Sequence, residues 1–150
     1  MPDVVLDANL LVLLIVGSAD RRYIARHRRL RAYTDSDFDL LQSLLPSMTS
    51  IIVTPNILTE ASNLASQIAE PARSHIAEAF RFFVSLAQEH YVDARRAVMQ
   101  PEFPQLWLTD AGVLEQMTKA NLLLTADQEL YLAALDRGLP AENFNYLRSL

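Results

Sequence analysis

The sequence has no cysteine, and only three glycines and three histidines among its 150 residues. Without cysteine, disulfides, a thiolate nucleophile and cysteine-bound zinc are excluded, so carboxylate and histidine side chains are the candidate metal ligands. The apolar run at residues 10–17 is shorter than the roughly 20 residues of a membrane-spanning helix. The chain also begins without the basic residues of a secretory signal and has an acid at position 3. We therefore expect a cytoplasmic protein with no membrane segment.

Length and hydropathy pattern predict one domain over residues 1–150, because the chain can form one well-packed core but not two. Short apolar, strand-like runs alternate with longer segments of helical periodicity. Strands are expected near residues 4–6, 50–54, 121–125 and 143–145, and helices near 8–16, 35–45, 55–69, 71–90, 111–119 and 126–137. This alternation predicts a three-layer α/β/α fold with a central, mainly parallel sheet of four to five strands.

The charge pattern has one cationic segment in an acidic chain. The formal net charge is -5, and Lys119 is the only lysine. Six of the 13 basic residues lie at positions 21–31. This segment is a solvated surface, an RNA-phosphate contact or a contact with a partner, and the sequence does not choose among the three. The candidate RNA-contacting residues are Arg21, Arg22, Arg26, Arg28 and Arg29.

Four acidic residues stand where a parallel sheet brings side chains together. Asp7 directly follows the first predicted strand, Asp127 follows the third by two residues, and Asp110 stands where the helix after residue 110 begins. Ligands of such sheets bind beyond the carboxyl ends of the strands. Glu60 lies inside a predicted helix, at the border of its apolar stripe, where a role as a helix cap does not explain it.

Each acid taken singly also fits an ordinary helix cap or a surface position. As a group, however, carboxylates without a counterion repel one another, so a cluster is expected only where a cation is held. Magnesium prefers oxygen ligands and retains bound water, which it activates for attack on phosphorus. Because four ligated acids leave the rest of the chain nearly neutral, the net charge does not argue against a nucleic-acid substrate.

The segments that carry these acids resemble, in order and spacing, the four acidic motifs of PIN-domain ribonucleases. They are residues 4–9, 54–60, 108–111 and 124–127, and the resemblance spans nearly the whole chain. It implies a fold similar to the flap-endonuclease core, one or two Mg²⁺ or Mn²⁺ ions, and endonucleolytic cleavage of single-stranded RNA to 5′-phosphate and 3′-hydroxyl ends. The catalytic and metal-binding residues that it implies are Asp7, Glu60, Asp110 and Asp127. Asn9, Thr109 and Thr125 match the polar positions beside them, which orient a carboxylate or a bound water.

The resemblance leaves several functions open. Many bacterial PIN domains are toxins of VapC-type toxin–antitoxin pairs, so an antitoxin is one expected partner, and family members commonly form homodimers. The alternative of a different class is a catalytically silent PIN-fold binding module or scaffold. A phosphoacceptor receiver domain is excluded because it needs a lysine after a late strand, whereas Lys119 lies near the end of a predicted helix. A haloacid-dehalogenase-type phosphatase is excluded because position 9 is asparagine rather than aspartate.

Overall fold

The computed structural model describes residues 2–150. Five strands form one sheet in the order β3-β2-β1-β4-β5, and every neighbouring pair is parallel. The strands are β1 (Asp3–Leu6), β2 (Ile51–Val53), β3 (Gln88–Glu89), β4 (Asn121–Thr125) and β5 (Ala141–Asn143). The predicted α/β class with a parallel sheet is confirmed, and the sheet has five strands.

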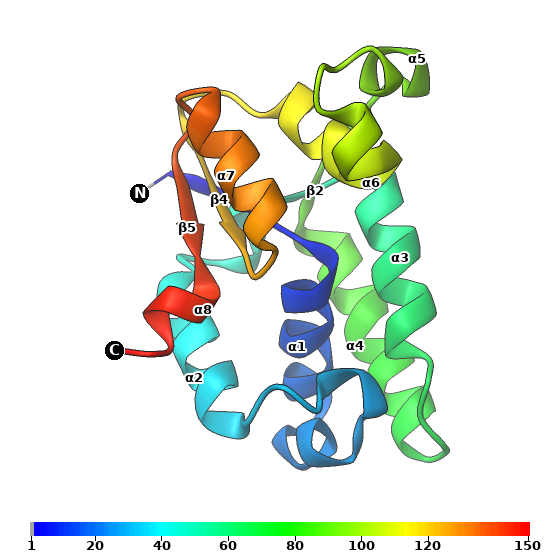
Figure 1. The fold of residues 1–150 in the computed structure, drawn as a ribbon. Helices are drawn as coiled ribbons and strands as arrows, with labels where there is room; N and C mark the ends of the chain where they lie inside the picture. The colour runs from blue at the N-terminus through cyan, green and yellow to red at the C-terminus, as the bar shows by residue number, and fades with distance from the viewer. Residues whose placement is uncertain (1) are drawn as a thin grey trace.

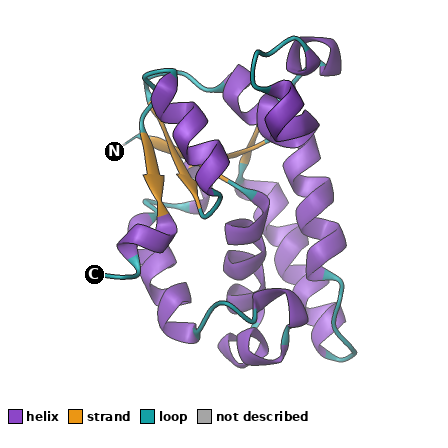
Figure 2. Ribbon diagram, in the orientation of Figure 1, coloured by secondary structure: helices purple, strands orange, loops and turns teal. Residues whose placement is uncertain are grey.

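Helices connect successive strands and surround the sheet (Figures 1 and 2). The α-helices are α1 (Ala8–Ala19), α2 (Asp35–Leu44), α3 (Pro55–Ala65), α4 (Ala72–Leu86), α5 (Ala94–Val98), α6 (Phe103–Gln116), α7 (Gln128–Asp136) and α8 (Phe144–Leu147). Three 3-10 helices are η1 (Arg21–Arg26), η2 (Arg28–Leu30) and η3 (Met48–Ser50). Within the described chain, no helix is long and apolar enough to span a membrane.

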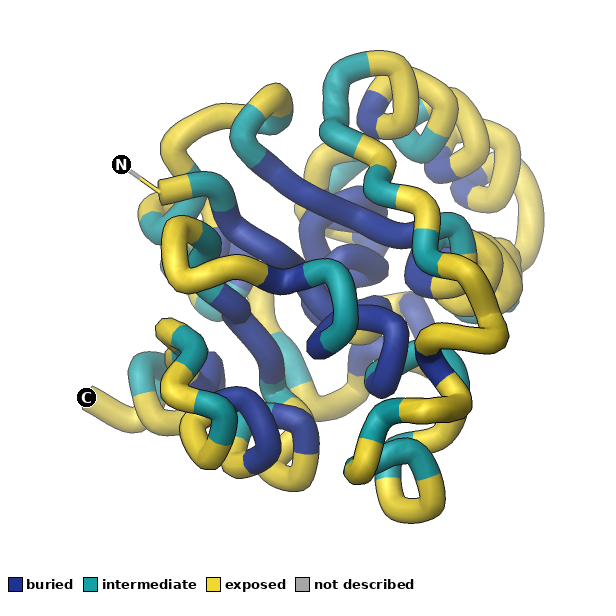
Figure 3. The backbone as a smooth tube through the Cα atoms, turned by 90° about the horizontal axis from the view of Figure 1, so that it is seen from above, coloured by how far each residue is buried: buried dark blue, intermediate teal, exposed yellow. Residues whose placement is uncertain are grey.

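The core is centred on the middle of the sheet and on α1. Both β1 and β2 are buried along almost their whole length, which requires cover on both faces because successive side chains of a strand point to opposite sides. In Figure 3 the buried segments run through the centre, and the exposed residues lie on the outer helices. Helix α1 packs against α3 and α4, and α6 packs against α7. The β-branched and leucine-rich runs of the sequence therefore form the interior, as predicted.

The observed boundaries correct several predictions. The strand predicted at 143–145 is β5, which ends at Asn143, and the next residue begins α8. The helix predicted at 71–90 ends at Leu86, because residues 88–89 add an edge strand beside β2. The helix predicted near 8–16 continues to Ala19. Asp110 is not the N-cap of its helix but lies in the first turn after the break of α6 at Trp107. For the edge strand, the pairing with β2 decides the conformation that the local sequence left open.

Gly17 is required by packing rather than by helix termination. A Cβ placed on Gly17 would overlap the ring of Phe38, a buried residue of α2. Gly17→Ala is therefore expected to lower the free energy of unfolding by about 1–3 kcal/mol, the usual effect of overpacking, in urea denaturation. Gly112→Ala is the matched control, because its Cβ would meet Val92 at 3.6 Å, an ordinary contact. Equal stability of the Gly17→Ala variant and the wild type would contradict this packing.

Candidate functional site

The strand order places two of the predicted acids at the point where the direction of the sheet reverses. The chain builds β2 and β3 on one side of β1, and β4 and β5 on the other. In such sheets the ends of the two central strands leave a crevice in which ligands bind. Asp7 follows β1, and Asp127 follows β4 by one intervening residue, Ala126. Since β1 and β4 pair directly, these two acids begin at the same edge of the sheet.

Asp7 is buried and is the N-cap of α1. Its Oδ1 accepts a hydrogen bond of 3.0 Å from the backbone N–H of Leu10. Its Oδ2 accepts a hydrogen bond from the Thr125 hydroxyl and another, of 3.0 Å, from the backbone N–H of Ala126. Asp7 is 5% exposed, and the burial raises the pKa of its carboxyl against the effect of these hydrogen bonds. Three donors from two segments thus fix this carboxylate in one orientation.

Asp127 is fixed by the same local network. Its Oδ1 caps α7 by accepting hydrogen bonds from the backbone N–H groups of Glu129 and Leu130, at 2.9 and 3.2 Å. Its own N–H donates to the hydroxyl oxygen of Thr125 at 3.0 Å. The fully buried Thr125 therefore connects Asp7 to Asp127, which is the orienting contact that the sequence predicts for it.

Glu60 and Asp110 are held differently. Glu60 lies in the middle of α3 and Asp110 lies in α6. No described residue donates a hydrogen bond to either carboxylate, and burial and neighbouring negative charge alone account for the change in their pKa values. Burial, then Asp127, Asp7 and Glu60, raises the pKa of Asp110 to about 7. Burial and then Asp7 also raise the pKa of Glu60. The two helices therefore present carboxylates that are free to reorient.

The four acids share one small cavity. It has a volume of about 50 Å³ and is lined by Asp7, Ala8, Asn9, Glu60, Asp110 and Asp127. No arginine, lysine or histidine is part of this lining, so the carboxylates face one another without a positively charged side chain between them. Burial and then their mutual repulsion raise the pKa of Asp110 from its ordinary value of 3.8. A divalent cation is the simplest partner for such a group of oxygens.

The oxygens do not yet stand in a coordination geometry. Within residues 2–150, no three acidic or histidine side chains are arranged to hold one metal ion. The reason is visible in the hydrogen bonds: Asp7 and one oxygen of Asp127 are directed at backbone N–H groups. The donor set fits Mg²⁺ or Mn²⁺ in chemistry and number, and Glu60 and Asp110, whose carboxylates accept no hydrogen bond from a described residue, are the side chains free to adjust to an ion.

The other predicted polar residues divide between two cavities. Asn9 is exposed and lines the acidic cavity itself. Thr109 lines a larger, adjoining cavity of about 550 Å³ that also contains Glu60 and Asp110. Thr125, as described above, contacts Asp7 directly. Of the three, only the role of Thr125 in orienting a carboxylate has a hydrogen bond to support it within the described chain.

The arginine segment lies at the other end of α1. This helix has 12 residues, about 18 Å at 1.5 Å per residue, and it separates Asp7 from Arg21. In Figure 1 the segment forms the turns at the lower end of α1. The predicted RNA-contacting arginines are therefore not gathered around the acids.

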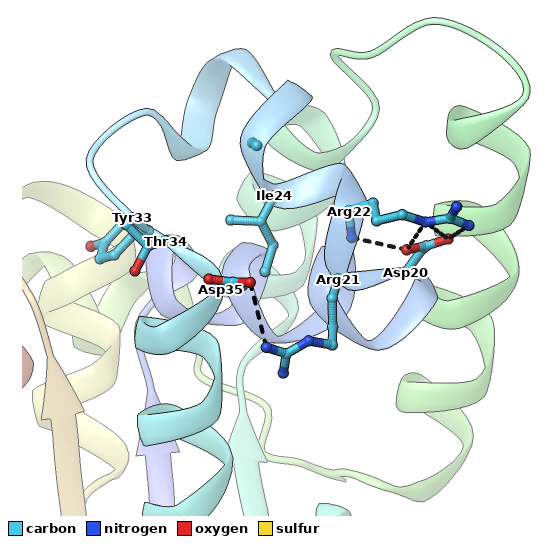
Figure 4. A pocket seen from close by; sticks show the side chains of 8 residues that line it. Asp20, Arg21, Arg22, Ile24, Tyr33, Thr34 and Asp35 are labelled. Atoms are coloured by element: carbon cyan, nitrogen blue, oxygen red, sulfur yellow. Dashed lines mark hydrogen bonds and ion pairs between the residues drawn. The ribbon is translucent and has the colours of Figure 1, made fainter.

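Most of these arginines already have partners. Arg21 pairs with Asp39 and with Asp35, and Arg22 pairs with Asp20 at 2.7 Å. Figure 4 shows Arg21 turned toward Asp35 and Arg22 toward Asp20, around a cavity of about 640 Å³. Because carboxylates neutralise this cavity, it is less suited to phosphate than its size indicates.

The three other arginines that the sequence predicts to contact RNA are exposed. Arg28 and Arg29 both donate to the side-chain oxygen of Gln67, at 3.0 and 2.7 Å, and Arg26 is exposed. None of the three approaches the acidic cavity, whose lining contains no arginine. Their contact with RNA stays a prediction.

Sequence reasoning missed Trp107. It lies inside α6 with a non-helical backbone, φ 64° and ψ -169°, so that the helix is broken three residues before Asp110. This conformation is almost confined to glycine. Trp107 is 67% exposed and lines the 550 Å³ cavity beside Glu60 and Asp110. The sequence could have pointed to Trp107, because it is the only tryptophan and stands beside an acidic motif, in a stretch without helical or strand periodicity.

The strain at Trp107 has a measurable consequence. Trp107→Gly is expected to be more stable than Trp107→Ala by about 1 kcal/mol, because glycine alone adopts this backbone conformation freely. Gly138→Ala supplies the control in the opposite direction, since Gly138 has φ 72° and a Cβ added there would meet nothing within 4 Å. Chemical denaturation of these variants and the wild type measures both differences. A more stable alanine variant at position 107 would show that the backbone there is not strained.

Comparison with known proteins gives no match. No family model, no curated protein and no solved structure matches the chain. The resemblance to PIN domains therefore stays a prediction that depends on the acidic motifs, and the function must be argued from the site.

Proposed function

We propose that the protein is a metal-dependent endoribonuclease that cleaves single-stranded RNA. The observation that carries the proposal is the shared cavity of Asp7, Glu60, Asp110 and Asp127, which come from four separate segments and face one another without a positively charged side chain. A cluster of this kind destabilises the protein unless it holds a cation. The cluster lies where the strand order of the parallel sheet reverses, and ligands of such folds bind at that point.

The four acids would hold one or two Mg²⁺ or Mn²⁺ ions. When bound, such an ion supplies a Lewis acid for the phosphoryl oxygen and lowers the pKa of a water molecule, so that phosphodiester hydrolysis needs no nucleophile from the protein. Asp7 and Asp127 are suited to be ligands of fixed orientation, because backbone N–H groups and Thr125 hold their carboxylates. Glu60 and Asp110 are suited to be ligands that adjust to the ion, because no described side chain or N–H group donates a hydrogen bond to their oxygens.

Asp110 has a second property that matters for hydrolysis. With a pKa of about 7, its carboxyl exchanges a proton near neutral pH, where an acid–base group works best. In the absence of a cation it is partly protonated near neutral pH, and a bound cation favours its ionised form. We therefore assign to Asp110 both a ligand position and control of the protonation state of the site.

The test is cleavage of an end-labelled single-stranded RNA of mixed sequence with Mg²⁺, with Mn²⁺ and with EDTA. Cleavage that requires a divalent ion and leaves 5′-phosphate ends is expected. Asp110→Asn is the diagnostic variant, and Asp136→Asn, an exposed acid at the end of α7, is the matched control. Equal cleavage by the wild type and Asp110→Asn would identify a contaminating nuclease. Absence of both cleavage and metal binding would favour the binding-module alternative.

A further inference from the structure

A second cavity adjoins the acidic one and differs from it in character. It has a volume of about 550 Å³, within the range of small-molecule sites. Glu60 and Asp110 belong to the linings of both cavities. A group that occupies the larger cavity therefore lies directly beside the carboxylates.

One wall of this cavity is a polar stripe on α3. Asn56, Thr59, Glu60 and Asn63 stand at positions i, i+3, i+4 and i+7, which lie on one face of a helix. Thr59 uses its hydroxyl hydrogen on the carbonyl of Pro55 and leaves its oxygen free to accept. The side-chain amides of the two asparagines carry both donors and acceptors, the groups that recognise the edges of nucleobases.

Trp107, on α6, lines the same cavity. Its ring is 67% exposed. Phe103 contacts it with ring centroids 5.4 Å apart and planes inclined by 58°, so Phe103 does not cover the indole face to face. The backbone conformation that directs this side chain is one that glycine adopts without strain and tryptophan does not. The presence of the largest side chain at such a position indicates that the ring itself has a role.

We propose that Trp107 is the stacking platform for one base of the RNA, next to the scissile phosphate. The inference rests on the proposed function, since it places the base beside the same carboxylates. Single-stranded nucleic acid is bound by aromatic rings that stack on successive bases. An unstacked base on Trp107 shares the cavity with the amides of Asn56 and Asn63 and with the carboxylates of Glu60 and Asp110. The cavity thereby selects single strands, because a paired base cannot enter it.

Trp107 is also the only tryptophan of the chain, so its fluorescence reports on this cavity alone. The experiment is a titration of the wild type with a short single-stranded RNA of mixed sequence, with Ca²⁺ to neutralise the carboxylates. Integrity of the RNA is checked on a denaturing gel. Saturable quenching is expected, and inorganic polyphosphate of similar charge, which has no bases, is expected to cause none.

The affinities of variants follow from anisotropy of a labelled RNA. Trp107→Ala is expected to weaken binding about tenfold, within the range for loss of one stacked base, while Trp107→Phe keeps the affinity within about threefold because it keeps a ring. Phe82→Ala is the control, since Phe82 is 60% exposed on α4 and does not line the cavity. Circular dichroism confirms that each variant is folded.

The outcomes separate this inference from the proposed function. Metal-dependent cleavage with unchanged RNA affinity in Trp107→Ala overturns the stacking role and leaves the ribonuclease intact. Fluorescence that changes with protein concentration, but not with RNA, overturns it in favour of an interface between copies of the chain. If the wild type neither binds nor cleaves RNA, both proposals fail. Quenching by RNA together with weaker binding by Trp107→Ala supports the stacking role.

Discussion

Asp110→Asn is expected to make the metal-free protein more stable while it reduces metal-dependent RNA cleavage by at least about 100-fold, which corresponds to about 2.7 kcal/mol of transition-state stabilisation. The two effects have one cause. In the metal-free protein the negative charge of Asp110 is opposed by burial and by the other carboxylates, whereas with a bound cation the same charge is needed. Replacement of a residue with a purely structural role would instead lower the stability of the protein.

The stability effect depends on pH in a defined direction. The pKa of Asp110 rises from 3.8 to about 7 on folding, so the folded state binds its proton more tightly than the unfolded state. Its favourable contribution is present below about pH 4 and is lost as pH rises through about 7. We expect Asp110→Asn to exceed the wild type by about 2 kcal/mol at pH 8 in EDTA, roughly half of the full linkage value, because water reaches the cavity.

Urea denaturation in EDTA at pH 4.5 and pH 8 measures this difference. The advantage of Asp110→Asn should be small at pH 4.5 and large at pH 8, and Asp136→Asn, an exposed acid outside the cavity, is the matched control. Addition of Mg²⁺ at pH 8 should stabilise the wild type more than the variant, since ligands stabilise the state that binds them. An Asp110→Asn variant that is less stable than the wild type at pH 8 would contradict the repulsion between the carboxylates.

Asp7→Asn is expected to have the opposite effect on stability. The carboxylate of Asp7 accepts hydrogen bonds from Leu10, Thr125 and Ala126. The side-chain amide of asparagine has one acceptor oxygen. Its NH₂ group would replace the other carboxylate oxygen of Asp7 and would therefore face a buried hydrogen-bond donor. Loss of the cap and an unsatisfied N–H should lower the free energy of unfolding by about 2–3 kcal/mol.

The contrast between the two variants decides how activity data are interpreted. Loss of cleavage in Asp7→Asn is ambiguous, because the variant also disturbs the start of α1. Loss of cleavage in Asp110→Asn is not ambiguous, because in the absence of metal that variant is expected to be more stable than the wild type. Denaturation of Asp7→Asn beside Asp110→Asn in EDTA tests this. Equal shifts in the same direction would show that the hydrogen bonds of Asp7 contribute little.

The sequence predicted the central strands and their acids for a physical reason. Strands that are covered on both faces read as uninterrupted apolar runs, and the polar residue at the end of such a run marks the edge of the sheet. Asp7 and Asp127 were found in this way, and both lie at the observed edge. Glu60 was found because it interrupts the border of an apolar stripe, and it does line the cavity with the others.

The features that were missed depend on contacts distant in sequence. The edge strand at Gln88–Glu89 has no strand-like composition and exists because β2 offers it a partner. The need for glycine at position 17 comes from the ring of Phe38 on another helix. The turn at Trp107 breaks a helix at a residue that disfavours its backbone conformation. The predicted antitoxin partner and homodimer stay predictions.

The most direct test of the carboxylate site as a metal centre is calorimetric titration of the wild type with Mn²⁺ at pH 7, in two buffers of different ionisation enthalpy. Because the raised pKa of Asp110, about 7, leaves this carboxyl partly protonated at this pH, binding should release protons, and the heat should differ between the buffers accordingly. Asp110→Asn should bind more weakly and release less. Binding of one or two ions with this proton release is the predicted result, and absence of saturable binding at millimolar Mn²⁺ would contradict the metal site and the ribonuclease proposed from it.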